Sequence, residues 1–177
     1  GDGSGYQIAQ TQPMKLAAVE GLYEGGTNVG LVGIGMLNPE KKTYNDGKDP
    51  FLFRIEIPSM LSFLAERDVD GYVPGITNII EGGYQLKDGT TALSAAEKIE
   101  RGKTAIGALA AYRAAKSAGH EEDAAVAYQV LQENMPYFGY GYIKDVNQLV
   151  PNVPLNFYAF RVMVILGGYF ILFFIVV

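Results

Sequence analysis

The chain has 177 residues, with 14 lysines and arginines against 19 aspartates and glutamates, so its formal net charge at pH 7 is −5. This balance disfavours nucleic acid as a partner, because binding to phosphate backbones needs a basic stripe of side chains. There is no cysteine, which excludes disulfides, thiolate catalysis and cysteine-based metal sites, and the single histidine, His120, excludes a site built from two histidines of this chain.

The first half of the sequence predicts short helices around a β-hairpin. A proline at the first turn and a glycine pair as the stop predict a helix over residues 14–23. Two apolar or alternating runs, near residues 29–37 and 51–57, flank a polar segment rich in Pro, Asn, Asp and Gly, which is typical of a hairpin. A short amphipathic helix is expected from Pro58 on, and a helical turn near residues 76–81.

The second half predicts a hairpin of two helices. Thr91 or Ser94 can cap a long Ala-rich helix that a glycine ends, and Ser94 with Glu97 has the pattern of a capping box. A second helix is predicted over residues 121–134 and stops before a proline. The following segment, residues 134–154, is rich in Tyr, Gly and Pro and is interpreted as a connector.

An apolar stretch closes the sequence. Residues 155–177 come close to the roughly 20 residues needed to cross the hydrocarbon core of a bilayer. A buried core helix is the alternative, but such a helix carries a polar stripe, and this one is apolar all round. The expected fold is therefore mainly α: a water-facing loop region with helices and a small β-hairpin (residues 1–153), then one transmembrane helix (residues 154–177), as in a fragment of a larger membrane protein.

Two charged residues of the first predicted helix raise the question of a site. At about 100° per residue, Glu20 falls on the same face as apolar Leu16 and Tyr23, and Lys15 lies at the edge of this face. A carboxylate on an apolar stripe is desolvated, which raises its pKa and suits it to accepting a proton near neutral pH. The pattern is equally that of a short helix whose Lys and Glu both reach water, so it leaves two interpretations open.

Arg161 and Met163 stand at the border of the apolar stretch and are equally ambiguous. Arg161 is typical of a cation at a helix end that extends its charge to the membrane–water interface, and Met163 is typical of an apolar residue that faces lipid or the protein core. The alternative is a heme site, in which a thioether is an axial ligand to iron and a guanidinium pairs with a propionate.

Three motifs carry a resemblance to a known family. The opening GDGSGYQIAQTQPMKLAAVEG, with its KLAAVE core, and the segment PLNFYAFRVMV near the other end resemble the two ends of the quinol-binding loop in subunit I of cytochrome bd-type quinol oxidases. RIEIPSMLSFLAERDVDGYVPG resembles the middle of that loop. Two parts of the chain resemble the family least, namely the segment with the predicted hairpin and the Ala-rich stretch. The resemblance therefore implies no function for these two parts.

The resemblance implies roles for four residues. Lys15 and Glu20 correspond to the residues of quinol binding and oxidation, Met163 to an axial ligand of the low-spin heme b, and Arg161 to the arginine near that heme's propionate. The family's other axial ligand is a histidine on an earlier helix, which His120 does not match. The high-spin heme b and heme d would likewise depend on helices outside this chain.

The resemblance also implies a setting. The chain would be part of a terminal respiratory oxidase that oxidises ubiquinol or menaquinol and reduces O2 to water, and alone it would be inactive. Its partners would be the lipid bilayer, the rest of subunit I and subunit II, in the bacterial cytoplasmic (inner) membrane with the loop on the periplasmic or extracellular side. The alternative is a membrane-anchored extracytoplasmic binding domain without catalytic activity.

Overall fold

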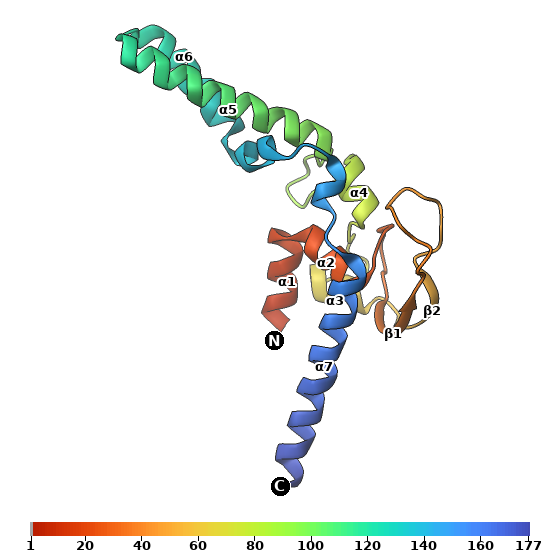
Figure 1. The fold of residues 1–177 in the computed structure, drawn as a ribbon. Helices are drawn as coiled ribbons and strands as arrows, with labels where there is room; N and C mark the ends of the chain where they lie inside the picture. The colour runs from red at the N-terminus through yellow and green to blue at the C-terminus, as the bar shows by residue number, and fades with distance from the viewer. Residues whose placement is uncertain (1) are drawn as a thin grey trace. The chain divides into compact units, whose positions relative to one another are not determined.

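Helices and one small sheet make up the computed structural model, which describes residues 2–177 (Figure 1). This confirms the mainly α fold class, with one hairpin and one long apolar helix at the C-terminal end. The α-helices are α1 (Asp2–Thr11), α2 (Pro13–Glu20), α3 (Met60–Glu66), α4 (Ile76–Glu81), α5 (Ala95–Ala118), α6 (Glu121–Asn134) and α7 (Val153–Val176). The strands are β1 (Leu31–Leu37) and β2 (Phe51–Ile57), and two 3₁₀ helices are η1 (Met135–Tyr142) and η2 (Val146–Leu149).

The chain forms two compact units. The first contains the residues up to Ile79 together with Val150–Val177, and the second contains Ile80–Leu149. The apolar helix α7 therefore belongs to the same unit as α1, α2, α3 and the hairpin, although more than 80 residues separate it from them in the sequence. Among the described residues, this helix is the one long and apolar enough to cross a membrane.

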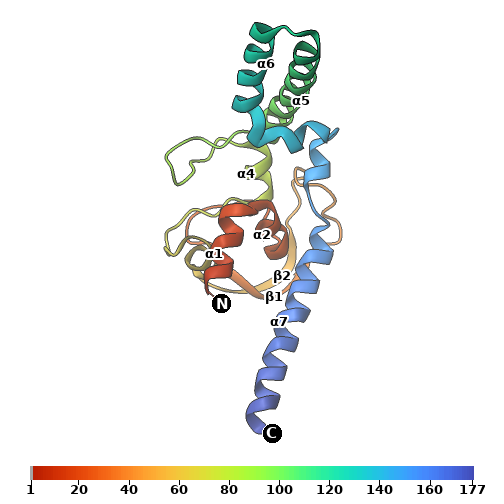
Figure 2. The same cartoon turned by 90° about the vertical axis from the view of Figure 1, so that its left-hand side faces the viewer.

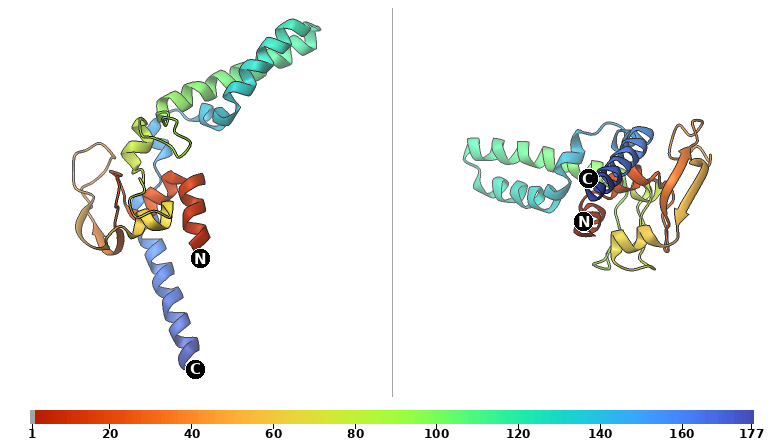
Figure 3. Two further views of the ribbon diagram at one scale, coloured as in Figure 1. Left: turned by 180° about the vertical axis from the view of Figure 1, so that it is seen from behind. Right: turned by 90° about the horizontal axis from the view of Figure 1, so that it is seen from below.

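The hairpin packs against the beginning of α7. Its strands are antiparallel and lie side by side (Figure 3). The backbone N–H of Leu37 in β1 donates to the Tyr158 hydroxyl of α7 at 3.0 Å. The ring of Phe51 in β2 meets that of Phe157 edge-on, with 5.6 Å between centroids. These contacts fix β1 beside the first two turns of α7, next to the border of the apolar stretch.

The pairing of β1 with β2 is irregular at two places, and these irregularities decide which side chains face the core. The pairing shifts between Val32 and Ile34 and again between Met36 and Leu37. The bulge in β2 places Phe51 in the core, at 8% exposure, whereas Phe53 is 54% exposed. The inward face thus packs on α7, and the outward face carries apolar side chains that are exposed in this chain, namely Ile34, Met36, Phe53 and Ile55.

A helix cap corrects the predicted end of the first helix. α2 begins at Pro13 as expected but ends at Glu20, before residue 23 and before the glycine pair predicted as its stop. Gly21 takes the left-handed conformation, with φ of 63°, and closes the helix. A side chain at this position would also meet the Phe51 ring at 3.0 Å, so glycine fits both the turn and the packing.

One further element departs from the prediction. α1 was not predicted, and it lies against α3 in the first unit, where Ala9 packs on the cluster of Leu61, Ala65 and Val73. The predicted connector after α6 contains the 3₁₀ helices η1 and η2. The short helices α3 and α4 and both strands lie close to the predicted positions.

The second unit is built around the hairpin of α5 and α6, which lie side by side in Figure 2 as predicted. Ser94 and Glu97 form the reciprocal capping box that starts α5, and Gly119 in the left-handed conformation ends it. Ala105, Ala108 and Leu131 form the core between the two helices. The 3₁₀ helix η1 lies close to α5, since a side chain on Gly102 would come within 2.3 Å of the backbone of Gly141.

Candidate functional site

All four residues singled out in the sequence line one cavity of about 590 Å³ in the first unit. Segments from both ends of this unit build it, namely α1, α2, β1, α3 and α7, and most of its wall is apolar. The lining residues are Ser4, Gly5, Ile8, Lys15, Leu16, Val19, Glu20, Leu31, Val32, Gly33, Leu61, Leu64, Ala65, Phe160, Arg161, Met163, Val164 and Ile165.

Glu20 is the buried carboxylate of this cavity. It is the last residue of α2 and is 4% exposed, so the interpretation in which its carboxylate reaches water is wrong. Burial raises the pKa of the Glu20 carboxyl above its ordinary value, and the charge and hydrogen bond of Arg161 offset part of that rise. One oxygen, Oε2, accepts from Arg161 at 3.1 Å, while Oε1 accepts no hydrogen bond from the residues that the structure describes.

Arg161 does not extend to the interface but points into the protein. Its Nη1 donates to the carbonyl of Val19 at 2.8 Å and to that of Phe157 at 3.2 Å. Its Nη2 donates to Glu20 Oε2 at 3.1 Å and to the carbonyl of Val32 at 2.8 Å. The side chain is 12% exposed. Its Nε is buried without a hydrogen-bond partner among the described residues, so one N–H of the guanidinium is left over.

Phe157 supports this arrangement and was not singled out in the sequence. It is fully buried, and the Arg161 guanidinium lies 3.5 Å from the centre of its ring. Its position four residues before Arg161 puts both on one face of a helix, so helical spacing alone could have pointed to the pair. The carbonyl of Val32 carried no comparable sequence signal.

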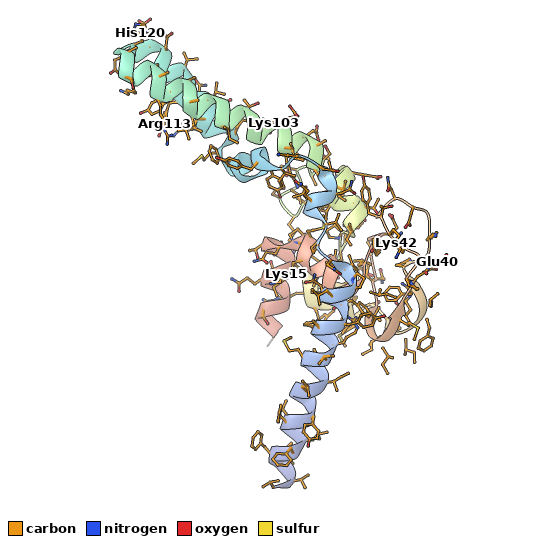
Figure 4. The ribbon with its side chains drawn as sticks, in the orientation of Figure 1. Lys15, Glu40, Lys42, Lys103, Arg113 and His120 are labelled. Atoms are coloured by element: carbon orange, nitrogen blue, oxygen red, sulfur yellow. The ribbon has the colours of Figure 1, made fainter. Side chains whose placement is uncertain are left out.

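Lys15 and Met163 lie on more open parts of the wall. Lys15 is exposed on α2, and Figure 4 shows it at the surface of the first unit. Its ammonium has no hydrogen-bond partner within residues 2–177 as far as the structure describes them. Met163 is 60% exposed and lies two residues after Arg161 on α7. His120 belongs to the other unit, at the turn between α5 and α6 (Figure 4).

This set of groups limits the chemistry of the cavity. The apolar wall suits an apolar molecule. The Lys15 ammonium can donate a hydrogen bond to an oxygen of that molecule, and the buried Glu20 carboxylate can accept a proton from it. The described residues contain no cluster of three or more His, Asp or Glu side chains that could hold a metal ion. The thioether of Met163 is a soft ligand of the kind that heme iron takes, and it would need a second ligand from elsewhere.

Comparison with known proteins places the chain in a family. The family model for cytochrome bd terminal oxidase subunit I matches residues 1–177. The chain is similar to cytochrome bd-II ubiquinol oxidase subunit 1 of Escherichia coli (strain K12), with 29% identity over 186 residues that cover 97% of this chain and 32% of that protein.

A solved structure, that of bd oxidase from Geobacillus thermodenitrificans, is 21% identical, with a TM-score of 0.36, and the match covers 88% of this chain and 34% of that one. The chain thus spans about a third of the length of these relatives. Because the family model matches every residue from 1 to 177, the chain belongs to the cytochrome bd terminal oxidase subunit I family.

Proposed function

We propose that this chain forms the quinol-oxidising site of a membrane-bound terminal respiratory oxidase. The observation that carries the proposal is that Lys15 and Glu20 line the same cavity as Arg161 and Met163, although about 140 residues separate the two pairs. A site that takes both protons and electrons from one substrate needs a proton acceptor and a path for electrons within reach of it. The alternative, an anchored binding domain without activity, gives no reason for this combination.

Glu20 would accept a proton from the quinol. Oxidation of a quinol removes two protons and two electrons, and a general base must lie within hydrogen-bond reach of the hydroxyl that loses its proton. Oε1 of Glu20 is free for this contact, because Arg161 binds the other oxygen. Burial raises the pKa of the Glu20 carboxyl toward neutral pH, and a general base is most effective when its pKa lies near the working pH.

Lys15 would bind and polarise the substrate. Its ammonium is unpaired among the described residues, so no bond within the chain has to break before it donates to a quinol oxygen. As the proton leaves, negative charge develops on that oxygen, and a nearby cation stabilises it. The apolar wall contributed by Leu16, Val19 and Leu61 would bury the ring and exclude water.

Met163 and Arg161 fit the requirements of a low-spin heme b. Met163 would supply a thioether ligand from α7, with a second ligand outside this chain, and Arg161, two residues before it on the same helix, would lie near a propionate. The heme, when bound, would supply the acceptor for the quinol's electrons. In the whole enzyme, the reduction of O2 to water would depend on a high-spin heme b and heme d, which helices outside this chain would hold.

The same proposal assigns a setting to the two parts of the chain. Residues 1–153 would form the extracytoplasmic quinol-binding region and residues 154–177 a transmembrane helix, in a bacterial cytoplasmic membrane with the loop on the periplasmic or extracellular side. The uncharged run of α7 after Arg161 supports this arrangement. The partners would be ubiquinol or menaquinol, lipid, the rest of subunit I and subunit II.

Replacing Lys15 tests the substrate contact. In the full oxidase, Lys15→Met should raise the KM for quinol roughly tenfold or more, because a hydrogen bond from a charged donor contributes about 1.5–3 kcal/mol. Steady-state quinol oxidation measures the change. Lys42→Met is the matched control, since Lys42 is also exposed but lies in the loop between the strands (Figure 4). An unchanged KM in Lys15→Met would remove Lys15 from the site.

Replacing Met163 tests the ligand. Met163→Leu keeps the size and apolar character of the side chain but removes the sulfur, so we expect the low-spin heme to change its reduced-minus-oxidised absorbance spectrum. Met36→Leu is the control, because Met36 is similarly exposed, at 56% against 60%, but lies on the outward face of the hairpin. A wild-type spectrum in Met163→Leu contradicts the ligand assignment.

A further inference from the structure

The guanidinium of Arg161 joins three segments that are distant in the sequence. It binds Glu20 and the carbonyl of Val19 at the end of α2, the carbonyl of Val32 in β1, and the carbonyl of Phe157 in its own helix. The partners on α2 and β1 are 129 to 142 residues away in the chain. These four bonds use all the hydrogens of the two terminal nitrogens.

The geometry of these bonds requires a planar, multidentate cation. A guanidinium donates in fixed directions, whereas a lysine ammonium is a compact point charge that cannot reach four acceptors in this arrangement. The Phe157 ring, 3.5 Å below, holds the plane of the guanidinium in place. Without the guanidinium, the buried carboxylate of Glu20 and the carbonyls of Val19 and Val32 would lose a donor in a site that water reaches poorly.

We propose that Arg161 is a positioning residue for quinol oxidation, which holds Oε2 of Glu20 and leaves Oε1 directed to the substrate. This role rests on the proposed function and deepens it. Arg161 also ties the end of α2 and strand β1 to the helix that carries Met163, so the proton acceptor and the proposed iron ligand keep a fixed separation. The role differs from that of a propionate partner, which would act through the heme and not through Glu20.

A double-mutant cycle in the full oxidase separates these two roles. Arg161→Gln should lower kcat by on the order of tenfold to 100-fold with little change in the KM for quinol, because a misplaced catalytic group slows the reaction without weakening substrate binding. In the background of Glu20→Gln, the same change should cost no more than about twofold, since the group that Arg161 positions no longer accepts a proton.

The outcomes discriminate clearly. If Arg161→Gln lowers kcat by the same factor in the wild-type enzyme and in the Glu20→Gln variant, Arg161 acts independently of Glu20 and the proposal is overturned. If the low-spin heme spectrum is also altered in that case, the effect of Arg161 is exerted through the heme. Wild-type kcat in Glu20→Gln alone would instead contradict the proposed function. Where Arg161→Gln fails to assemble, judged by heme content, Arg161→Lys replaces it in the same cycle. Arg54→Gln, an exposed arginine of β2, is the control.

Discussion

Glu20→Gln in the full-length oxidase should lower the kcat of quinol oxidation by about 10²-fold or more, which is the usual contribution of a general base. Glutamine keeps the shape of the side chain, and its amide oxygen can still accept from Arg161, so the cavity and the arginine keep their arrangement. What is lost is an oxygen basic enough to take a proton. Steady-state turnover with a quinol substrate measures the effect, and heme content shows whether the enzyme assembles.

The pH profile of this variant gives an independent readout. A base works only when it is deprotonated, so wild-type activity should fall as the pH drops through the pKa of Glu20. That pKa lies above the ordinary value for a glutamate, because burial outweighs the stabilising charge of Arg161. The fall should therefore occur at a higher pH than for a solvent-exposed carboxylate, and Glu20→Gln should lose this limb of the profile.

An exposed glutamate provides the matched control for both measurements. Glu40 lies in the loop between the strands, with its side chain 74% exposed (Figure 4), and Glu40→Gln should keep both kcat and the pH profile. If Glu20→Gln turns over quinol at the wild-type rate over the whole pH range, another group accepts the proton and the assignment of Glu20 is wrong.

Local signals explain which elements could be predicted from the sequence. α5 and α6 have the predicted limits, because a capping box, a terminal glycine and a following proline act within a few residues of each helix end. The hairpin is also local, with two β-prone runs around a turn-rich loop. By contrast, the sequence offers α2 two local stops, Gly21 and the later glycine pair, and the packing of Gly21 against Phe51 and Phe157, which favours the first stop, arises only in the tertiary structure.

In the candidate site, too, local patterns predicted some features, whereas others depend on contacts between distant segments. Helical periodicity placed Glu20 on an apolar face but could not decide whether it reached water, since that depends on what covers the face. The cover comes from α7 and β1, and the Arg161 side chain comes from 141 residues away. Periodicity within one helix carries no information about such a partner, so the pattern of α7 alone favoured an arginine at the membrane border. The resemblance to a family brought Lys15, Glu20, Arg161 and Met163 together, and the cavity gives them a common location.

Phe157→Ala should cause the largest loss of stability among single substitutions in the first unit. Removing a fully buried aromatic ring from a core typically costs about 3–5 kcal/mol, through lost burial and the cavity that remains. Phe157 is fully buried and contacts the rings of Phe51 and Tyr158 as well as Arg161. We therefore expect a lower midpoint for thermal loss of the low-spin heme absorbance in the detergent-solubilised oxidase.

The matched control for this effect is Phe53→Ala on the outward face of the hairpin, where the ring is 54% exposed and no ring contact ties it to α7 in the described structure. Equal midpoints for the two variants would contradict the central role given to Phe157. Removal of the Phe157 ring should also lower kcat at temperatures where the variant stays folded, because this ring holds the plane of the Arg161 guanidinium. Phe157→Leu separates the two effects, since leucine refills much of the core volume but offers no aromatic face to Arg161.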